Sequence, residues 1–373
     1  MSELRLIDDQ TRTGAAGRIQ LNQNGFLIDN FAVKELVLQL TYNGTNGDGA
    51  NAESLYDGAL TWAYNQRVTV ELSNGSRLID NVPIGLVDVA QSFNYKTDTA
   101  APTLAIAPEY AAGATADNQS VFLRIPVAWT QAQRSRDFWR SLSSFGAVYY
   151  DFNNTGVNSD ITVNSVRAQL YAVGCTVNDV MVPPPLKVRY FAPTSDLVDR
   201  LNIGGERILY LGAVTTDATN EPITEIVQPQ VQFDGRMVLD ARQTIESSDV
   251  QALQGEQRYA ATNFPPFGVT GAGTARTRFQ TWYAAPDDFK ISELPPVKAV
   301  QLEYSAQGIP TEELYYVAVT ACTLRAGDAA ALIPSLRGED NAQIQQRASR
   351  KIANAGGMVS PALKAALPVT FKR

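Results

Sequence analysis

Apolar residues along the chain occur in short runs that predict many β-strands and little helix. Residues 36–42 form a nearly continuous apolar run, and residues 68–72 alternate between apolar and polar side chains. Runs of the same kind occur at 77–79, 121–125, 147–152, 161–163, 166–177, 231–233, 237–239, 278–283, 297–304 and 314–324. Roughly seven or eight strands in each half of the chain indicate an all-β sandwich or jelly roll.

Turn and helix signals fit between these runs. Asn74-Gly75 and Asp234-Gly235 each separate two strands, and we expect type I′ turns because both central residues need positive φ. One helix is predicted from Thr130, which has Gln133 three positions later as in a capping box, to Leu142. A shorter helix is expected after Pro286.

The two halves of the chain repeat one another in order. Leu27-Ile28-Asp29 resembles Leu197-Val198-Asp199, and each predicted turn is followed five residues after its glycine by Asp80 or Asp240. Further matches join Trp129 to Trp282, Asp137-Phe138 to Asp288-Phe289, 147–152 to 299–304, and 174–176 to 321–323. A collinear series of this kind predicts two copies of one domain, each of roughly 150 residues, fused in tandem.

This repeat defines the expected domains. They are an N-terminal arm at 1–26, a first jelly roll at 27–182, a linker at 183–196, a second jelly roll at 197–326 and a basic C-terminal arm at 327–373. The linker begins with Pro183-Pro184-Pro185, which predicts a stiff extended spacer. Long loops are expected at 43–54, 94–119 and 245–276, where surface function or contacts with neighbours usually lie.

Composition excludes several kinds of chemistry. The chain of 373 residues has no histidine, which excludes a Ser-His-Asp or Cys-His nucleophile, His-ligated metals and an imidazole pH switch. The two cysteines, Cys175 and Cys322, occupy matching strands, and we expect two buried free thiols. The chain has no apolar run long enough to span a bilayer and no signal-peptide pattern, so we expect synthesis in the cytoplasm.

Charge is distributed unevenly. The formal net charge is −7, yet after Asp340 the chain has six basic residues and no acid. These residues are Arg347, Arg350, Lys351, Lys364, Lys372 and Arg373. A basic arm on an acidic body predicts an anionic partner, such as lipid head groups, nucleic acid or an acidic patch on a neighbouring subunit. The alternative is a solvated tail without a partner.

Other candidate sites are weaker. The stretch 43–51 interleaves oxygen-bearing side chains with glycine, as calcium loops do, but lacks EF-hand spacing, so a polar loop is favoured over a metal site. Asp287-Asp288 and Glu312-Glu313 are adjacent carboxylates, which point to opposite faces of a strand and make poor acid/base pairs. The tryptophans are expected in the core rather than in a sugar-binding groove. We assign no catalytic residue, metal or cofactor.

The paired all-β copies, long loops and terminal arms resemble the double jelly-roll major capsid proteins of the lineage of adenovirus and the tailless, membrane-containing bacteriophages. The resemblance is architectural, covers nearly the whole chain and includes no short diagnostic motif. It implies two tandem eight-stranded jelly rolls with a short helix in each, and a homotrimeric, pseudo-hexameric capsomer of an icosahedral shell. It also implies a virion location after synthesis in the host cytoplasm.

The same resemblance implies that the partners are other copies, neighbouring capsomers, minor capsid proteins and membrane lipids, without specific nucleic-acid recognition. The terminal arms would lie on the inner side of the shell, with the basic tail on anionic lipid. Two alternatives remain open at this point. One is another virion protein, such as a spike; the other is a carbohydrate-active enzyme or lectin built from jelly rolls.

Overall fold

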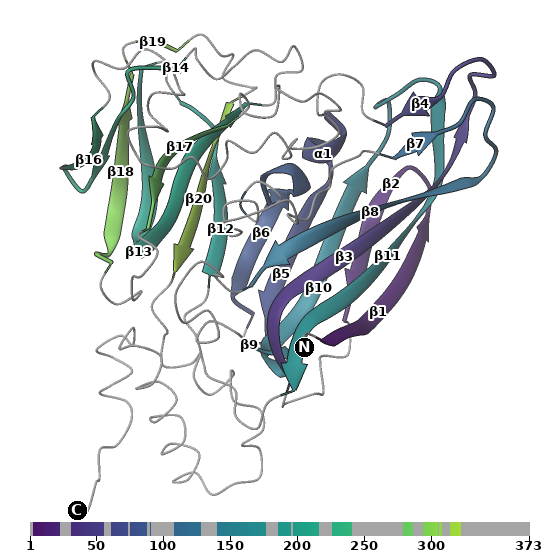
Figure 1. Ribbon diagram of the computed structural model, residues 1–373, viewed down its shortest axis with the longest axis horizontal. Helices are drawn as coiled ribbons and strands as arrows, with labels where there is room; N and C mark the ends of the chain where they lie inside the picture. Colours follow the sequence, from purple (N-terminus) through teal and green to yellow (C-terminus); the bar gives the residue numbers. More distant parts are fainter. Residues whose placement is uncertain are drawn as a thin grey trace, which may run out of the picture.

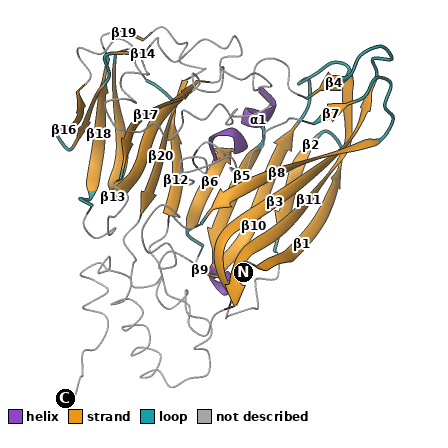
Figure 2. Ribbon diagram, in the orientation of Figure 1, coloured by secondary structure: helices purple, strands orange, loops and turns teal. Residues whose placement is uncertain are grey.

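The computed structural model shows a molecule built almost entirely of strands (Figures 1 and 2). The residues that it describes are 3–22, 31–55, 61–73, 75–87, 90, 108–127, 140–176, 186–194, 197–215, 226–240, 279–285, 294–304, 306–307 and 314–321. The predicted all-β fold class is confirmed.

In the first half of the chain, eight long strands form two facing sheets. They are β1 (Glu3–Thr13), β2 (Ala16–Leu21), β3 (Phe31–Asn46), β5 (Arg67–Leu72), β6 (Arg77–Pro83), β8 (Asp117–Pro126), β10 (Phe145–Asn153) and β11 (Ile161–Thr176). One sheet has the order β1-β11-β3-β8, with the short β9 (Arg140–Ser141) beside β3. The other has the order β2-β10-β5-β6. We call this unit the first roll.

The second half of the chain repeats this arrangement. Its strands are β12 (Leu186–Phe191), β13 (Val198–Thr215), β15 (Gln230–Phe233), β16 (Arg236–Asp240), β17 (Phe279–Ala284), β18 (Val297–Glu303) and β20 (Leu314–Ala321). The long strand β13 takes part in both sheets, because it pairs with β18 up to Glu206 and with β20 from Arg207. Gly204 and Gly205 lie close to this change of partner with φ of +75° and +83°, a backbone conformation that residues with a Cβ rarely adopt. We call this unit the second roll.

Strand pairing is the same in the two rolls among the described residues. The order β1-β11-β3-β8 corresponds to β12-β20-β13-β17, and β2-β10-β5-β6 corresponds to β13-β18-β15-β16. When the two parts of β13 are counted separately, each roll has eight strands in two four-stranded sheets. This is the architecture of a jelly roll.

The two rolls are joined through one continuous sheet. Strand β12 of the second roll lies parallel to β6 of the first, with Val188 opposite Ile79, and antiparallel to β20 on its other side. This link makes the eleven-stranded sheet that runs across the molecule from β16 to β2 (Figure 1). Four short strands form two separate ribbons, β4 (Glu53–Ser54) with β7 (Glu109–Tyr110), and β14 (Ile226–Val227) with β19 (Ala306–Gln307).

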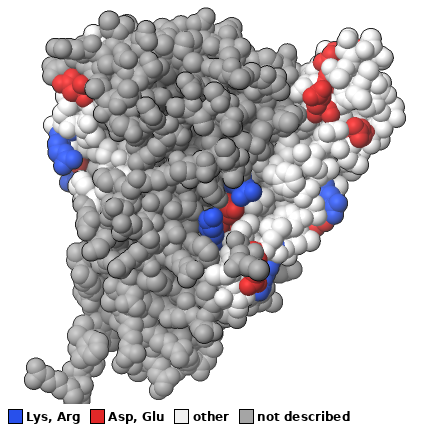
Figure 3. All heavy atoms as spheres, viewed as in Figure 1, with Lys and Arg blue, Asp and Glu red and all other residues white. Residues whose placement is uncertain are grey.

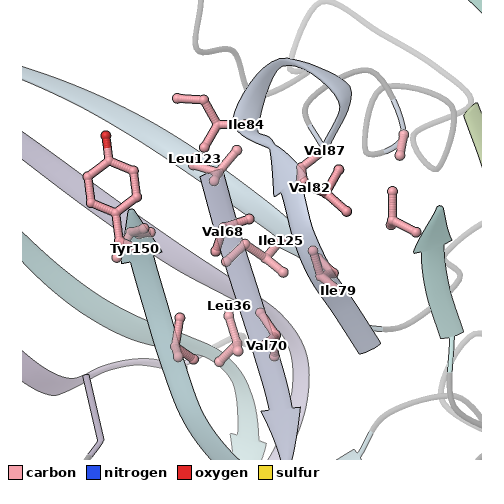
Figure 4. Close-up of a cluster of buried hydrophobic side chains, with 14 of the residues drawn as sticks. Leu36, Val68, Val70, Ile79, Val82, Ile84, Val87, Leu123, Ile125 and Tyr150 are labelled. Atoms are coloured by element: carbon pink, nitrogen blue, oxygen red, sulfur yellow. The ribbon is translucent and has the colours of Figure 1, made fainter. Parts of the chain in front are cut away.

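The core of the first roll lies between its two sheets. Side chains from β3 and β8 on one sheet meet side chains from β5, β6 and β10 on the other (Figure 4). The labelled members are Leu36, Val68, Val70, Ile79, Val82, Ile84, Val87, Leu123, Ile125 and Tyr150, all buried. Alternation of apolar and polar residues along each strand places one set of side chains inward, which is why the periodicity identifies these strands.

The two predicted turns have different outcomes. Asp234 and Gly235 have φ of 49° and 83°, the positive values that a type I′ turn requires, and the prediction is confirmed. In the first roll, Gly75 N donates to Leu72 O, and Leu72 N donates to Ser76 O. The loop therefore has three residues, with Gly75 (φ +80°) in the left-handed position that closes such loops, rather than the two-residue turn expected at Asn74-Gly75.

The helix predictions fall largely outside the described residues. This is true of 130–139 and of 286–290. Where the first prediction is described, Arg140–Ser141 is the strand β9, and Leu142–Ser144 is a single 3₁₀ turn (η2). Helix α1 (Thr61–Asn65) was not predicted; it packs Trp62 into the core of the first roll.

Two segments expected to connect or flank the domains contribute strands. The expected N-terminal arm at 1–26 contains β1 and β2, which pair with β11 and β10 at the edges of the two sheets. The expected linker at 183–196 contains β12, while Pro183-Pro184-Pro185 lies outside the described residues. In the structure, each roll therefore includes strands that precede the expected starts at 27 and 197.

Candidate functional site

The outward face of the second roll is covered by the first roll. Residues on β12, β20 and β13 that point away from the second roll's own core are buried in the same cluster as the core of the first roll. They are Leu186, Val188, Leu209, Tyr210, Val214, Val317, Val319 and Ala321. The second roll's own core forms a separate cluster on the other side of these strands, around Trp282.

Aromatic and charged side chains close the contact between the rolls. Tyr64 stacks on Tyr315 with ring centroids 5.5 Å apart, and Tyr315 also contacts Tyr190, 6.0 Å away. Arg67 donates to the Tyr190 hydroxyl at 2.9 Å and lies over its ring. Since Tyr64 and Arg67 belong to the first roll and the other two tyrosines to the second, these contacts hold one roll against the other.

The corresponding face of the first roll has three exposed large apolar side chains. Outward positions on β1 and β8 are occupied by Leu4, Leu6 and Phe122, with 64%, 53% and 46% of their surface exposed. Leu4 is paired with Val173 and Leu6 with Tyr171 on β11, both half-buried. Figure 3 shows mostly uncharged surface on this side of the first roll, with a few charges of both signs. Leu4 and Leu6, beside Val173 and Tyr171, thus form an exposed apolar area at the β1 edge, whereas Phe122 lies on the opposite edge beyond Gln39 and Gln169. An exposed apolar area at a sheet edge is typical of an interaction surface.

An ion pair and a cation–π contact hold β1 onto this sheet. Arg167 of β11 donates from Nε to Asp9 Oδ1 at 2.8 Å and from Nη2 to the other carboxylate oxygen. The hydrogen bond from Arg167 lowers the pKa of Asp9 below its usual range. Arg5, beside Leu4, stacks over the Phe31 ring with its guanidinium carbon 4.3 Å from the centroid. Leu4 and Leu6 are therefore presented by a strand fixed in place.

A partly buried carboxylate holds β12 onto the second roll. Glu206 accepts hydrogen bonds from Lys187 and Arg189, both at 3.0 Å, and from Thr320 at 2.6 Å. Burial disfavours ionisation of Glu206, but the hydrogen bond from Thr320 and the two cations outweigh it, so its pKa is lowered. Since β12 also pairs with β6, this cluster stabilises the joint between the rolls.

Two open hollows lie over the same joint. One, of about 560 Å³, lies over the sheet of the first roll and is lined by Arg18, Arg77 and Tyr190 among others. The second, of about 450 Å³, shares Arg77 and Tyr190 and extends over β12. Arg77 is paired with Glu71 at 3.1 Å and with Asp80 at 2.6 Å, so its charge is already neutralised.

The predicted site residues have separate outcomes. The basic tail residues Arg347, Arg350, Lys351, Lys364, Lys372 and Arg373 lie outside the described residues, as do Trp129, Cys322 and the carboxylate pairs at 287–288 and 312–313. Trp282 is fully buried, as expected. Cys175 is a free thiol but only partly buried, because it lies near the end of β11.

The glycine-rich stretch at 43–54 is partly strand. Strand β3 continues to Asn46, whose side chain donates to backbone oxygens of Asn51 and Ala111. Asp48 accepts hydrogen bonds from Ala50 N and Asn51 Nδ2, which lower its pKa. Across the described ranges, no three His, Cys, Asp or Glu side chains lie together as a metal would require. The side-chain oxygen atoms of Asn46 and Asp48 accept hydrogen bonds within this stretch, whereas those of Asn43 and Thr45 accept hydrogen bonds from Asn164 of β11.

Comparison with known proteins is informative for structure only. No protein-family model matches the sequence. No curated protein matches it either. In the part of the chain that the structure describes, no helix is long and apolar enough to cross a membrane.

Two solved structures are similar over most of their length. The crystal structure of the major capsid protein of STIV, the Sulfolobus turreted icosahedral virus, has a TM-score of 0.51 and 10% identity, covering 86% of this chain and 96% of that chain. A chain in the atomic structure of the same virus has a TM-score of 0.50 and 10% identity, covering 96% of this chain and 98% of that one. With its two rolls of matching strand order, the protein has the double jelly-roll fold of this viral major capsid protein.

Proposed function

We propose that the protein is the major capsid protein of an icosahedral virus and assembles as a homotrimeric, pseudo-hexameric capsomer. The supporting observation is that one chain carries two jelly rolls of matching strand order, joined side by side through β6 and β12. Three such chains offer six similar lateral faces, which tile a hexagonal lattice. The similarity in fold to a viral major capsid protein supports the same function.

The proposed role is structural rather than catalytic. Two buried carboxylates and one partly buried carboxylate are engaged within the rolls: Glu35 with Arg124, Asp199 with Thr194 and Tyr316, and the partly buried Glu206 with β12. Carboxylates held in this way stabilise strand pairing and are poorly placed for proton transfer to a substrate.

We further propose that the capsid surrounds an internal membrane and that the basic tail at 341–373 contacts its anionic lipids. Each Lys or Arg close to such a surface contributes up to about 1 kcal/mol. Neighbouring capsomers and minor capsid proteins are the other proposed partners, and the virion is the proposed location.

Light scattering of the purified full-length protein tests the trimer. A mass three times that of the 40.5 kDa chain, constant over a wide concentration range, is the expected result. A stable monomer at high concentration would overturn the proposed capsomer.

A further inference from the structure

Within one chain, the outward sheet face of the second roll is covered by the first roll. The outward side chains of β12 and β20, among them Val188 and Val319, are buried in the same cluster as the core of the first roll, and β6 of the first roll continues the sheet beside β12. Ile79 on β6 lies opposite Val188 and belongs to the core of the first roll. The core of one roll therefore extends over the outward face of the other.

The first roll has an equivalent strand and face that are open in the described structure. Strand β1 corresponds to β12, since each is the end strand within its own roll and pairs antiparallel with the last strand of that roll, β11 or β20. Leu4 and Leu6 occupy on β1 the outward positions that Leu186 and Val188 occupy on β12. The first pair is more than half exposed, whereas the second pair is buried.

The second roll has the matching open edge. Strand β16 corresponds to β6, because each follows a hairpin turn with glycine and pairs with the strand before it. Leu239 lies opposite Val231 just as Ile79 lies opposite Val70, so Leu239 is the counterpart of the residue that meets β12. Among the described strands, β16 pairs only with β15, and Met237 on it is 40% exposed.

We propose that β16 of one copy lies parallel to β1 of a second copy and continues its sheet, as β6 does for β12 within the chain. The core of the second roll of one copy would then cover Leu4 and Leu6 of the next. Figure 1 shows β1 and β16 on opposite sides of the molecule, so this contact joins two different copies. The inference rests on the proposed capsomer and names the surfaces that form it.

Such a contact is heterologous, because it uses two different surfaces of the same chain. Repeated from chain to chain, it either closes into a ring or extends indefinitely. It also places both open strand edges inside the assembly, where their backbone groups are paired instead of being available for aggregation.

Cysteine cross-linking tests the proposal in a Cys175→Ser, Cys322→Ser background of the full-length chain. Leu4→Cys and Met237→Cys each provide one accessible thiol, and strands adjacent in a sheet lie only about 4.8 Å apart. The two variants are co-expressed and treated with a short flexible bismaleimide, and each is also treated alone. Thr155→Cys, in an exposed turn, replaces Met237→Cys in the matched control.

We expect covalent dimers from the co-expressed pair, and none from either variant alone or from the Thr155→Cys control. A chain that carries both cysteines should give a covalent trimer. Cross-linking of Leu4→Cys to itself would indicate a two-fold, face-to-face contact and would overturn the proposal.

An oligomer by light scattering without cross-links between the two positions would also overturn the proposed contact, while leaving the capsomer intact. A monomer by light scattering, in contrast, would overturn the capsomer and this contact together. The two measurements therefore separate failure of the interface from failure of the proposed function.

Discussion

Replacing Leu4 and Leu6 together by lysine should dissociate the assembly without unfolding the chain. Both side chains are more exposed than buried in the single chain, so the change removes little from the folded monomer. Burial of a whole leucine side chain is worth about 1.5–3 kcal/mol, and somewhat more than half of each is still to be buried. The pair therefore contributes about 2–3 kcal/mol to each contact between copies.

In a closed ring of three chains this loss occurs at three contacts, which gives about 6–9 kcal/mol for complete dissociation. Each 1.4 kcal/mol changes an equilibrium constant about tenfold, so the shift lies well within the range of sedimentation equilibrium. Two lysine ammonium groups facing an apolar surface increase the loss further, because a charge is costly to bury without a partner.

Sedimentation equilibrium over a wide range of protein concentration measures the effect, and circular dichroism with thermal unfolding checks that the monomer remains folded. The control is Thr155→Lys, which adds a charge at an exposed turn, and its association should match that of the unmodified protein. If the double lysine variant associates as tightly as this control, the assigned role of the β1 face is refuted.

Three further predictions concern the tail, a strand contact and the joint between the rolls. Deleting 341–373 should preserve the trimer but reduce binding to anionic vesicles. Co-sedimentation measures the binding, with zwitterionic vesicles as the control. Unchanged binding would contradict the proposed contact between the tail and lipid. Gly174→Ala should destabilise the chain by roughly 1–3 kcal/mol or more in denaturant unfolding, because the added Cβ would lie 1.9 Å from Ala32 O, whereas Gly49→Ala, with nothing within 4 Å, should have little effect. Glu206→Gln should cost about 2 kcal/mol at pH 7, since it weakens charge-assisted hydrogen bonds to β12. Because the pKa of Glu206 is lowered, its contribution to stability is present above the ordinary carboxyl value of 4.5 and is lost as the pH falls through the lowered pKa. The difference in unfolding free energy between wild type and variant should therefore shrink in acid. A difference that stays constant with pH would contradict the assignment.

The inner strands were predictable because each has one face in a core. Residues 36–42 and 68–72 lie in β3 and β5, where the apolar positions face between the sheets. Strand β1 was missed because it is an edge strand, largely exposed and rich in polar residues. Its outward leucines, Leu4 and Leu6, do alternate with Arg5, and this short alternation was the available signal.

Strand β12 was missed for a different reason. Leu186, Val188 and Tyr190 alternate with Lys187 and Arg189 as in a half-buried strand, but the preceding prolines favoured a spacer. Which face of this strand would be covered depends on the neighbouring roll, and a local pattern does not specify that contact. The candidate surface could therefore not be predicted from the sequence, since it follows from comparing the two rolls in three dimensions.

Electron microscopy of the purified full-length protein tests the central claim most directly. If the two similar jelly rolls of each chain form a pseudo-hexameric capsomer, averaged images viewed along its axis should show hexagonal outlines with six similar densities from three chains. Images of isolated two-lobed particles, or of rings with another number of lobes, would contradict the account.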